Sequence, residues 1–204
     1  MQICGIDEAG RGSMLGPLVI AGISLDKRKL RKLSSIGVKD SKKLSPKLRE
    51  ELYKKIIEIA DDYYITKISP RSIDASVKTH CLNGLEAKYM AKVVSKLNPH
   101  TSYVDSCDVN PRRFGKEISK LSNNHKIKSY HHADSRFVVV SAASILAKVT
   151  RDRTIAKLRK NYNLGSGYPS DSTSVKFVTK YYKINHVMPS FVRKSWKPIQ
   201  RILR

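Results

Sequence analysis

The amino-acid sequence predicts an α/β protein in which a mixed sheet is flanked by helices and followed by a C-terminal helical appendage. Two apolar runs of strand length open the chain, and further strand-length runs then alternate with helical patterns. Helical patterns dominate the last third of the chain. At 204 residues, 40% of them hydrophobic, the chain can bury a large core. We expect residues 1–162 to form the α/β domain and residues 163–204 to form the helical appendage.

Strands are expected in short apolar runs that lie between turn signals. The first two runs are joined by a glycine-rich loop that ends at Gly16-Pro17. The later runs each follow a segment with a helical pattern, as expected for a sheet covered by helices. The expected strands are Gln2 to Asp7, Leu18 to Leu25, Tyr63 to Ile68, Thr101 to Asp105 and Lys126 to Tyr130.

Helices are expected where N-cap signals or apolar residues three or four apart occur. Ser45-Pro46 and Ser69-Pro70 each place an N-cap residue before a proline at the first helical position. Apolar residues at helical spacing run from Leu82 to Leu97. A small-residue segment, 141–144 (Ser-Ala-Ala-Ser), would let its helix lie close against a sheet. We expect helices over residues 46–60, from residue 70, and over residues 82–97, 111–121, 137–160 and 171–183.

The charge of the chain points to a polyanionic partner. Lysine and arginine outnumber aspartate and glutamate by 40 to 17, which gives a net charge of +23 and an isoelectric point near 10.1. Nucleic acid is the first candidate partner. An anionic membrane surface is a distant second, because no segment combines a basic face with a strongly apolar one. A charge that served only solubility would be smaller.

The same composition argues against a membrane or secreted protein. No apolar run is long enough to span a bilayer. The three cysteines lie far apart and fit neither a zinc site nor a disulfide framework. We therefore expect a reducing, cytoplasmic location.

The segment from Gly5 to Gly12 carries the most informative pattern in the chain. It places Asp7 and Glu8 at the end of an apolar run and directly before a Gly-Arg-Gly turn. Mg²⁺ prefers one or two carboxylates together with phosphate oxygens, so such a pair could hold a cation against a phosphodiester. Successive strand side chains point to opposite faces, so the two acids could share one site only if the strand ends there. The alternative is that they merely close a strand at the surface.

Three further acids stand at the ends of expected elements. Asp105 ends a strand, Asp134 precedes the long helix, and Asp40 lies beside Lys42 and Lys43. Each has a purely structural alternative. Asp134 could be the N-cap of the long helix, Asp40 could form a turn, and Asp105 could simply end its strand.

Taken together, these segments closely resemble the type 2 ribonucleases H (ribonuclease HII). The motifs appear in the order typical of that family and span nearly the whole chain, and the Gly-Ser-Gly-Tyr form of one of them resembles the archaeal branch. Ser13 and Cys107 stand where proline is more usual, and neither change removes a candidate ligand. The matching segments are residues 5–12, 40–45, 105, 133–148, 165–171 and 193–196.

The resemblance implies a ribonuclease H fold with a mixed five-stranded sheet flanked by helices, and a metal-dependent active site. It assigns the catalytic and metal-binding carboxylates to Asp7, Glu8, Asp105 and Asp134. Two Mg²⁺ or Mn²⁺ ions about 4 Å apart would activate a water molecule and stabilise the leaving 3′ oxygen. Clustered carboxylates repel one another unless cations neutralise them, so we expect the site to be incompletely formed without metal.

The resemblance also implies how the substrate is recognised. The 2′-hydroxyl is what distinguishes a ribose from a deoxyribose. In the family, this group is read by the turn that matches Gly10, Arg11 and Gly12, and by a tyrosine that matches Tyr168. The basic residues expected to contact phosphate are Lys42, Lys43, Lys148 and Arg193.

The activity implied is that of an endoribonuclease acting on RNA–DNA hybrids and on ribonucleotides embedded in DNA. We expect the protein to be a monomer and its C-terminal helical part, residues 163–204, to bind substrate. A DNA-junction nuclease of the same fold and a non-catalytic basic RNA-binding protein remain as alternatives. The first would cut an all-DNA substrate, and the second would not cleave a hybrid. Gln200 and Leu203 weakly suggest a sliding-clamp peptide, although the aromatic pair of such a peptide is missing.

Overall fold

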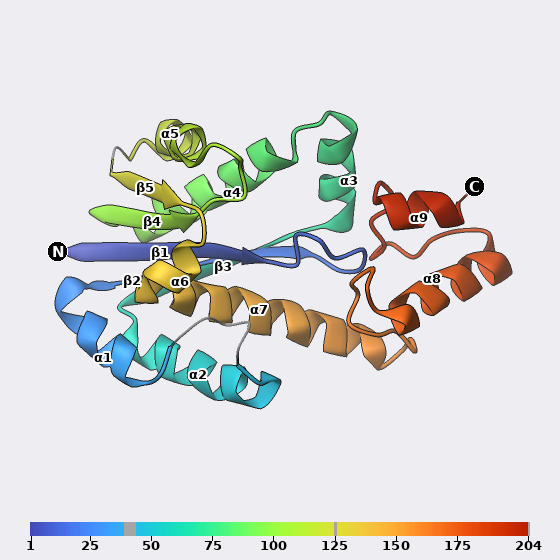
Figure 1. Cartoon of the computed structure of the whole chain (residues 1–204), viewed down its shortest axis with the longest axis horizontal. Helices are drawn as coiled ribbons and strands as arrows, with labels where there is room; N and C mark the ends of the chain where they lie inside the picture. The colour runs from blue at the N-terminus through green and yellow to red at the C-terminus, as the bar shows by residue number, and fades with distance from the viewer. Residues whose placement is uncertain (39–43, 125, 204) are drawn as a thin grey trace. The chain divides into compact units, whose positions relative to one another are not determined.

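The computed structural model describes residues 1–38, 44–124 and 126–203, and its centre is a mixed five-stranded sheet with the order β3-β2-β1-β4-β5 (Figure 1). Strand β1 pairs in parallel with β4, and β4 pairs in parallel with β5. Every expected strand is present, and β1 continues two residues beyond the expected end. The strands are β1 Gln2–Ala9, β2 Leu18–Asp26, β3 Asp62–Ile68, β4 Thr101–Asp105 and β5 Ile127–Tyr130.

The expected helices are also present, and the two Ser-Pro signals mark helix starts as predicted. The Ser45 side chain accepts a hydrogen bond from the Leu48 amide, and Ser69 does the same for Ser72. The long helices are α2 Pro46–Ile59, α3 Pro70–Lys78, α4 Leu82–Leu97, α5 Pro111–Ser122, α7 Val138–Arg159 and α8 Ser172–Asn185. Short elements that were not predicted are the 3-10 turn Lys27–Lys29, α1 Leu30–Ser35, α6 Ala133–Arg136 and α9 Lys197–Ile202.

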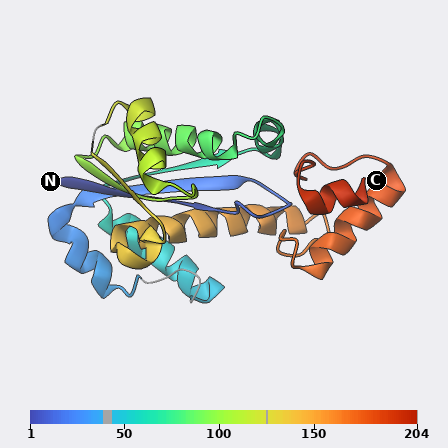
Figure 2. The same cartoon turned by 45° about the horizontal axis from the view of Figure 1, so that its top comes forward.

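The two faces of β1 are covered by different helices, and both views show α4 and α7 on opposite sides of the sheet (Figures 1 and 2). A Cβ atom added to Gly5 would lie 2.3 Å from the backbone carbonyl of Val139, so the start of α7 packs directly on this strand. The small residues 141–144 are all buried there, which confirms the predicted close approach. On the other face of the sheet, a Cβ added to Gly22 of β2 would lie 2.3 Å from Val93 of α4 and 3.4 Å from Ile6 of β1.

The chain divides into two compact units. The first consists of Met1–Ala9, Ile20–Thr66 and Asn83–Val149, and the second of Gly10–Val19, Lys67–Leu82 and Thr150–Arg204. The second unit has its own apolar core, which includes Met14 and Leu15 of the early loop and Val178 and Ile199 of the C-terminal helices. A boundary near residue 162 between separate domains stays a prediction.

None of the helices in the described ranges is long and apolar enough to cross a membrane.

Candidate active site

Asp7 and Glu8 both lie inside β1, which ends at Ala9, so they point to opposite faces of the sheet. The Asp7 carboxylate is hydrogen-bonded by Ser144 of α7 and is close to the charges of Asp105 and Asp134. Glu8 points toward α4, where Glu86 is its acidic neighbour, and it is also close to Asp105. The strand does not end at the pair, and the two acids instead share Asp105 as a neighbour.

Asp105 ends β4, which lies beside β1 in the sheet. One of its carboxylate oxygens accepts a hydrogen bond of 2.7 Å from the backbone amide of Ala133. This contact ties the end of β4 to the short helix α6, in which Asp134 follows Ala133. Asp134 is therefore not the N-cap of the long helix, because α7 begins only at Val138. The purely structural alternative for Asp134 was wrong.

Burial and mutual repulsion raise the proton affinity of the two acids of β1. Burial is the main cause that raises the pKa of Asp7 to about 7, and the charges of Asp105 and Asp134 add to it, while the hydrogen bonds from Ser144 and from the Glu8 amide oppose it. The pKa of Glu8 is raised well above its usual range by burial first, and then by the charges of Asp7, Glu86 and Asp105. These acids are held together at a cost that a cation would remove.

The acids do not yet form a finished coordination shell. Across residues 1–38, 44–124 and 126–203, no three His, Cys, Asp or Glu side chains converge closely enough to hold a metal ion as they stand. Repulsion between these like charges opposes a closer approach, and a divalent cation would offset it. The donors are all carboxylate oxygens, the ligand type that Mg²⁺ and Mn²⁺ prefer, so the residues present fit such ions.

Glu86 is an acid of this site that the sequence analysis missed. It is fully buried on α4, and the Cys107 thiol donates a hydrogen bond of 2.7 Å to one of its carboxylate oxygens. A signal was available, because Glu86 lies among the apolar residues at helical spacing between Leu85 and Tyr89. An acid on the buried face of a helix needs hydrogen-bond or charge partners, so its position in the apolar pattern indicates a buried polar site.

Lys148 also belongs to the first unit. It is half-buried on α7, four residues after the Ser144 that bonds Asp7, and so lies one turn further along the same helix face. Lys42 and Lys43, together with Asp40, fall outside the described residues.

The Gly-Arg-Gly turn lies in the second unit, where it is held against the loop that carries Tyr168. The Met14 amide donates a hydrogen bond of 2.9 Å to the Gly167 carbonyl, and the Leu15 amide donates to the same oxygen. The Ser13 hydroxyl oxygen lies 2.8 Å from this carbonyl as well. Gly10 and Gly167 both have φ of +86°, a conformation that favours glycine. The two loops predicted to read the ribose are therefore joined through one carbonyl group.

Arg151 of α7 fastens these two loops together. Its side chain is 4% exposed, and one guanidinium nitrogen donates to the Ser13 hydroxyl at 2.9 Å and to the Ser166 carbonyl. The guanidinium carbon lies 4.4 Å from the centroid of the Tyr168 ring, in cation–π contact. The sequence analysis missed this residue, since nothing in the local sequence distinguishes a buried arginine from an exposed one on a helix.

Arg193 also holds the Gly-Arg-Gly turn. Its side chain is fully buried, and its guanidinium donates to the Gly16 carbonyl at 3.1 Å and to the Arg11 carbonyl at 2.8 Å. Its backbone amide donates to the Met14 carbonyl. An effect of Arg193 on a substrate would therefore pass through the turn that it holds, and a direct contact with phosphate stays a prediction.

Helix α3 supports the segment that contains Arg193. The Asp74 carboxylate accepts hydrogen bonds from the Lys194 amide at 3.0 Å, the Ser195 amide at 2.9 Å and the Ser195 hydroxyl at 2.6 Å. One carboxylate thus orients two consecutive residues next to the buried arginine. The contact joins residues 120 positions apart, and the sequence offered no signal for it.

The chain matches a known family over most of its length. Residues 4–199 match the family model described as ribonuclease HII. The chain belongs to the ribonuclease HII family. This confirms the resemblance from the sequence motifs and the expectation of an enzyme.

Ribonucleases HII from archaea are similar to this chain over its whole length. It is 57% identical to the ribonuclease HII of Cenarchaeum symbiosum over 202 residues, which cover 99% of this chain and 98% of that one. It is 51% identical to the ribonuclease HII of Thermococcus sibiricus, covering 99% of this chain and 91% of that one. These matches support the predicted archaeal likeness.

Solved structures of ribonuclease HII share its fold. The ribonuclease H2 of Pyrococcus horikoshii superposes with a TM-score of 0.93 at 43% identity, covering 100% of this chain and 97% of that one. The ribonuclease HII of Archaeoglobus fulgidus, solved in a complex with PCNA, gives a TM-score of 0.88 at 38% identity and covers 97% and 96% of the two chains. The predicted ribonuclease H fold is confirmed.

Proposed function

We propose that this chain is an endoribonuclease that hydrolyses the RNA strand of RNA–DNA hybrids and cuts on the 5′ side of ribonucleotides embedded in duplex DNA. The products would carry 3′-hydroxyl and 5′-phosphate ends. The observation that carries the proposal is the cluster of buried and half-buried acids on β1, β4 and α6. Asp7, Asp105 and Asp134 are close enough for their charges to raise the pKa of Asp7.

Asp7, Glu8, Asp105 and Asp134 are the residues that we propose hold two Mg²⁺ or Mn²⁺ ions. Such ions supply an activated water and neutralise charge on the leaving oxygen. The chain itself orients the ligands. Ser144 donates a hydrogen bond to Asp7 and the Ala133 amide donates one to Asp105, and these contacts orient the two carboxylates.

Recognition of the ribose is the proposed task of the two joined loops of the second unit. Gly10, Arg11 and Gly12 offer backbone groups at the turn, and Tyr168 offers an aromatic face and a hydroxyl. A site built to hydrogen-bond a hydroxyl rejects the analogue that lacks it, because its own polar groups are then left unpaired. The Arg151 guanidinium on the Tyr168 ring supports this role, since it restrains the ring.

The phosphate contacts are proposed for the exposed or half-buried cations. Half-buried Lys148 on α7 is one candidate. Lys42 and Lys43 stay candidates from the sequence alone. Contacts of this kind position a duplex without reading its sequence.

One experiment tests the proposed function. A DNA duplex with a single embedded ribonucleotide is incubated with the protein, with and without Mg²⁺, and the cut is mapped. We expect a metal-dependent cut on the 5′ side of the ribonucleotide and none in Asp7→Asn. Cleavage of the matched all-DNA duplex would indicate a junction-type nuclease, and binding of a hybrid without any cleavage would indicate a non-catalytic RNA-binding protein.

A sliding clamp is a further partner to test, since the Archaeoglobus fulgidus relative was solved in a complex with PCNA. In this chain Gln200 and Leu203 are the candidate residues, and the Gln200 side chain already bonds the Lys194 carbonyl within the tail. Titration of an archaeal clamp with the wild-type protein and with Gln200→Ala would test the contact. Light scattering of the free protein would test the expected monomer.

A further inference from the structure

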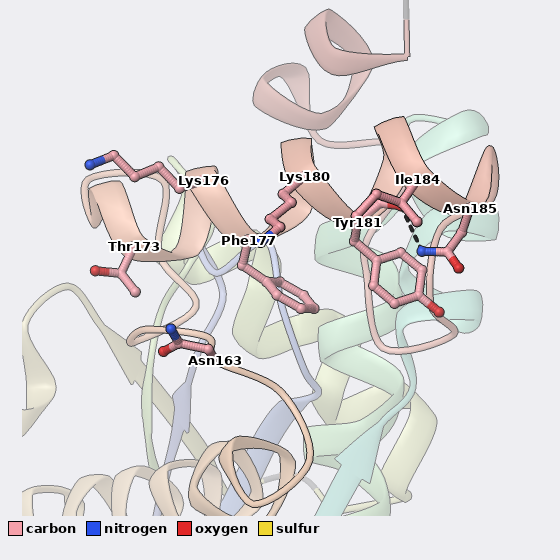
Figure 3. Close-up of a pocket in the computed structure, with 8 residues that line it drawn as sticks. All are labelled: Asn163, Thr173, Lys176, Phe177, Lys180, Tyr181, Ile184 and Asn185. Atoms are coloured by element: carbon pink, nitrogen blue, oxygen red, sulfur yellow. Dashed lines mark hydrogen bonds between the residues drawn. The ribbon is translucent and has the colours of Figure 1, made fainter.

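Helix α8 carries a pocket of about 370 Å³ with an aromatic floor and lysines at its edge (Figure 3). The residues from α8 recur every three or four positions, so they lie on one helix face. Phe177 and Tyr181 point to the same side of α8, and Asn163 lies opposite them on the segment that precedes the helix. We call this the α8 surface. It is formed by Asn163, Lys176, Phe177, Lys180, Tyr181 and Ile184.

The aromatic floor is fixed by contacts beneath it. The Phe177 and Tyr181 ring centroids lie 5.8 Å apart, and Phe177 also stacks on Phe191 at 6.1 Å with an interplanar angle of 19°. Tyr162 contacts both Phe177 and Tyr181. Rings packed in this way lose little further freedom when a planar group is placed on them.

The edge of the α8 surface is strongly basic. Lys176, Lys180 and the neighbouring Lys183 are exposed, and no Asp or Glu occurs from Ser172 to the end of the chain. Large exposed apolar groups follow this basic row in the chain, with Ile184 directly after Lys183 at 65% exposed and Val187 at 61%. A partner that fits must offer negative charge and apolar, planar groups side by side.

We propose that the α8 surface binds an unpaired strand of nucleic acid, with a base on the Phe177 and Tyr181 rings and phosphates on Lys176 and Lys180. Aromatic rings and cations combined in one groove are the usual means of holding single strands. A duplex fits less well, because its bases are already stacked and paired and only its phosphates could reach the lysines. The proposal deepens the proposed function, because it adds an unpaired strand to the duplex as a ligand.

The binding test uses all-DNA probes without divalent ions, so that no cleavage can occur. Fluorescence anisotropy gives the affinity for a short oligothymidylate, for a blunt DNA duplex, and for the same duplex with a single-stranded overhang. We expect the overhang to increase affinity over the blunt duplex. Tyr181→Ala should weaken oligothymidylate binding by roughly 5-fold or more, the lower end of the loss expected for one stacked base, and Tyr181→Phe should restore it.

A charge variant separates stacking from electrostatics. Lys180→Ala should reduce the dependence of log affinity on log salt, whereas Tyr181→Ala should leave this slope unchanged. Lys120→Ala on α5 removes the same charge from an exposed site of the first unit and serves as the matched control. The double variant Lys176→Glu/Lys180→Glu alters exposed positions only, so it keeps the test valid should Tyr181→Ala fold poorly.

Three results would overturn the proposal. They are equal affinity for the blunt and overhanging duplexes, unchanged oligothymidylate binding by the charge-reversed double variant, and tighter binding of an acidic peptide with aliphatic side chains than of oligothymidylate. Because the probes contain no ribose, these results do not depend on catalysis. If the protein cleaves hybrids but gives any of these three results, the proposed function stands and only the binding of an unpaired strand at the α8 surface is rejected.

Discussion

Replacing Arg151 by lysine should separate the joined recognition loops while keeping the positive charge. The guanidinium spans the Ser13 hydroxyl, the Ser166 carbonyl and the Tyr168 ring at the same time. A lysine has a single compact ammonium group and cannot reach all three. We expect it to keep one polar contact and to leave the Tyr168 face.

The size of the effect follows from these contacts. Losing one hydrogen bond from a charged group costs about 1.5–3 kcal/mol, and losing a cation–π contact costs about 0.5–2 kcal/mol. Contacts made by one group are not additive, so we expect a loss of about 2–3 kcal/mol in the free energy of unfolding. For a chain of this length, such a loss lowers the melting temperature by roughly 4–12 °C.

Cleavage should report the release of Tyr168 separately from stability. A substrate with one embedded ribonucleotide offers one binding register, whereas a continuous hybrid offers a ribose at every register. If about 1 kcal/mol of the loss falls on the placement of Tyr168, kcat/KM for the single-ribonucleotide substrate drops about 5-fold more than for the hybrid. Tyr168→Ala should shift the ratio in the same direction, and Tyr168→Phe should lie between.

Arg159→Lys is the matched control, because Arg159 is an exposed arginine of the same helix that bonds the Gly165 carbonyl and not the Tyr168 ring. It should change neither the melting temperature nor the substrate ratio appreciably. An Arg151→Lys protein with wild-type melting temperature and an unchanged substrate ratio would refute the view that Arg151 positions the two loops.

Three further predictions concern individual aspartates. Asp105→Asn should reduce cleavage by more than the roughly 10–100-fold typical of a residue that only orients a metal ligand, with little change in melting temperature; full activity would contradict its assignment as a ligand. Because the pKa of Asp7 rises from 3.8 to about 7 on folding, this group favours the folded state below about pH 4 and loses that contribution as pH rises through 7. Denaturant unfolding without divalent ions measures this effect. The free energy of unfolding of Asp7→Asn, relative to that of the wild type, should rise by on the order of 4 kcal/mol from about pH 4 to about pH 7. A difference between the two proteins that does not change with pH would exclude the raised pKa. Asp74→Ala should lower the free energy of unfolding by about 2 kcal/mol, and with it the melting temperature and the selectivity for ribose. Asp74→Asn should restore part of both, since its amide oxygen still accepts hydrogen bonds. Equal effects of the two variants would argue against the hydrogen bonds as the cause.

The regular elements could be predicted because their signals are local. Ser45 and Ser69 mark helix starts through contacts three residues away, and the helix over residues 82–97 follows from its own apolar spacing. The turn and short helix over residues 27–35 were missed because this basic segment has no clear apolar period. Helix α6 was missed because a long-range hydrogen bond, from the Ala133 amide to Asp105, holds it in place.

The candidate site likewise has a part that could be predicted from local sequence and a part that could not. Its acids stand out in the sequence, because aspartate and glutamate are scarce in this chain and follow apolar runs. The opposite orientation of Asp7 and Glu8 was not predictable, because β1 continues past Glu8 through pairing with neighbouring strands and not through a signal in its own sequence. The roles of Arg151 and Asp74 could not be predicted from the sequence for a similar reason. Both act on residues far away in the chain, and their local surroundings are those of ordinary helix positions.

The residues that hold the Gly-Arg-Gly turn come from the far end of the chain, and this sets the order in which a ribosome can complete the two units. All acids of the candidate site have been synthesised by the time residue 149 is added, and so has the whole sheet. The turn has by then also been synthesised, whereas Arg151, Gly167 and Arg193 have not. A nascent chain can therefore assemble its acids early but cannot fasten the ribose-reading loops until synthesis is nearly finished. An unfinished chain would hold its acids without the means proposed here to choose a substrate.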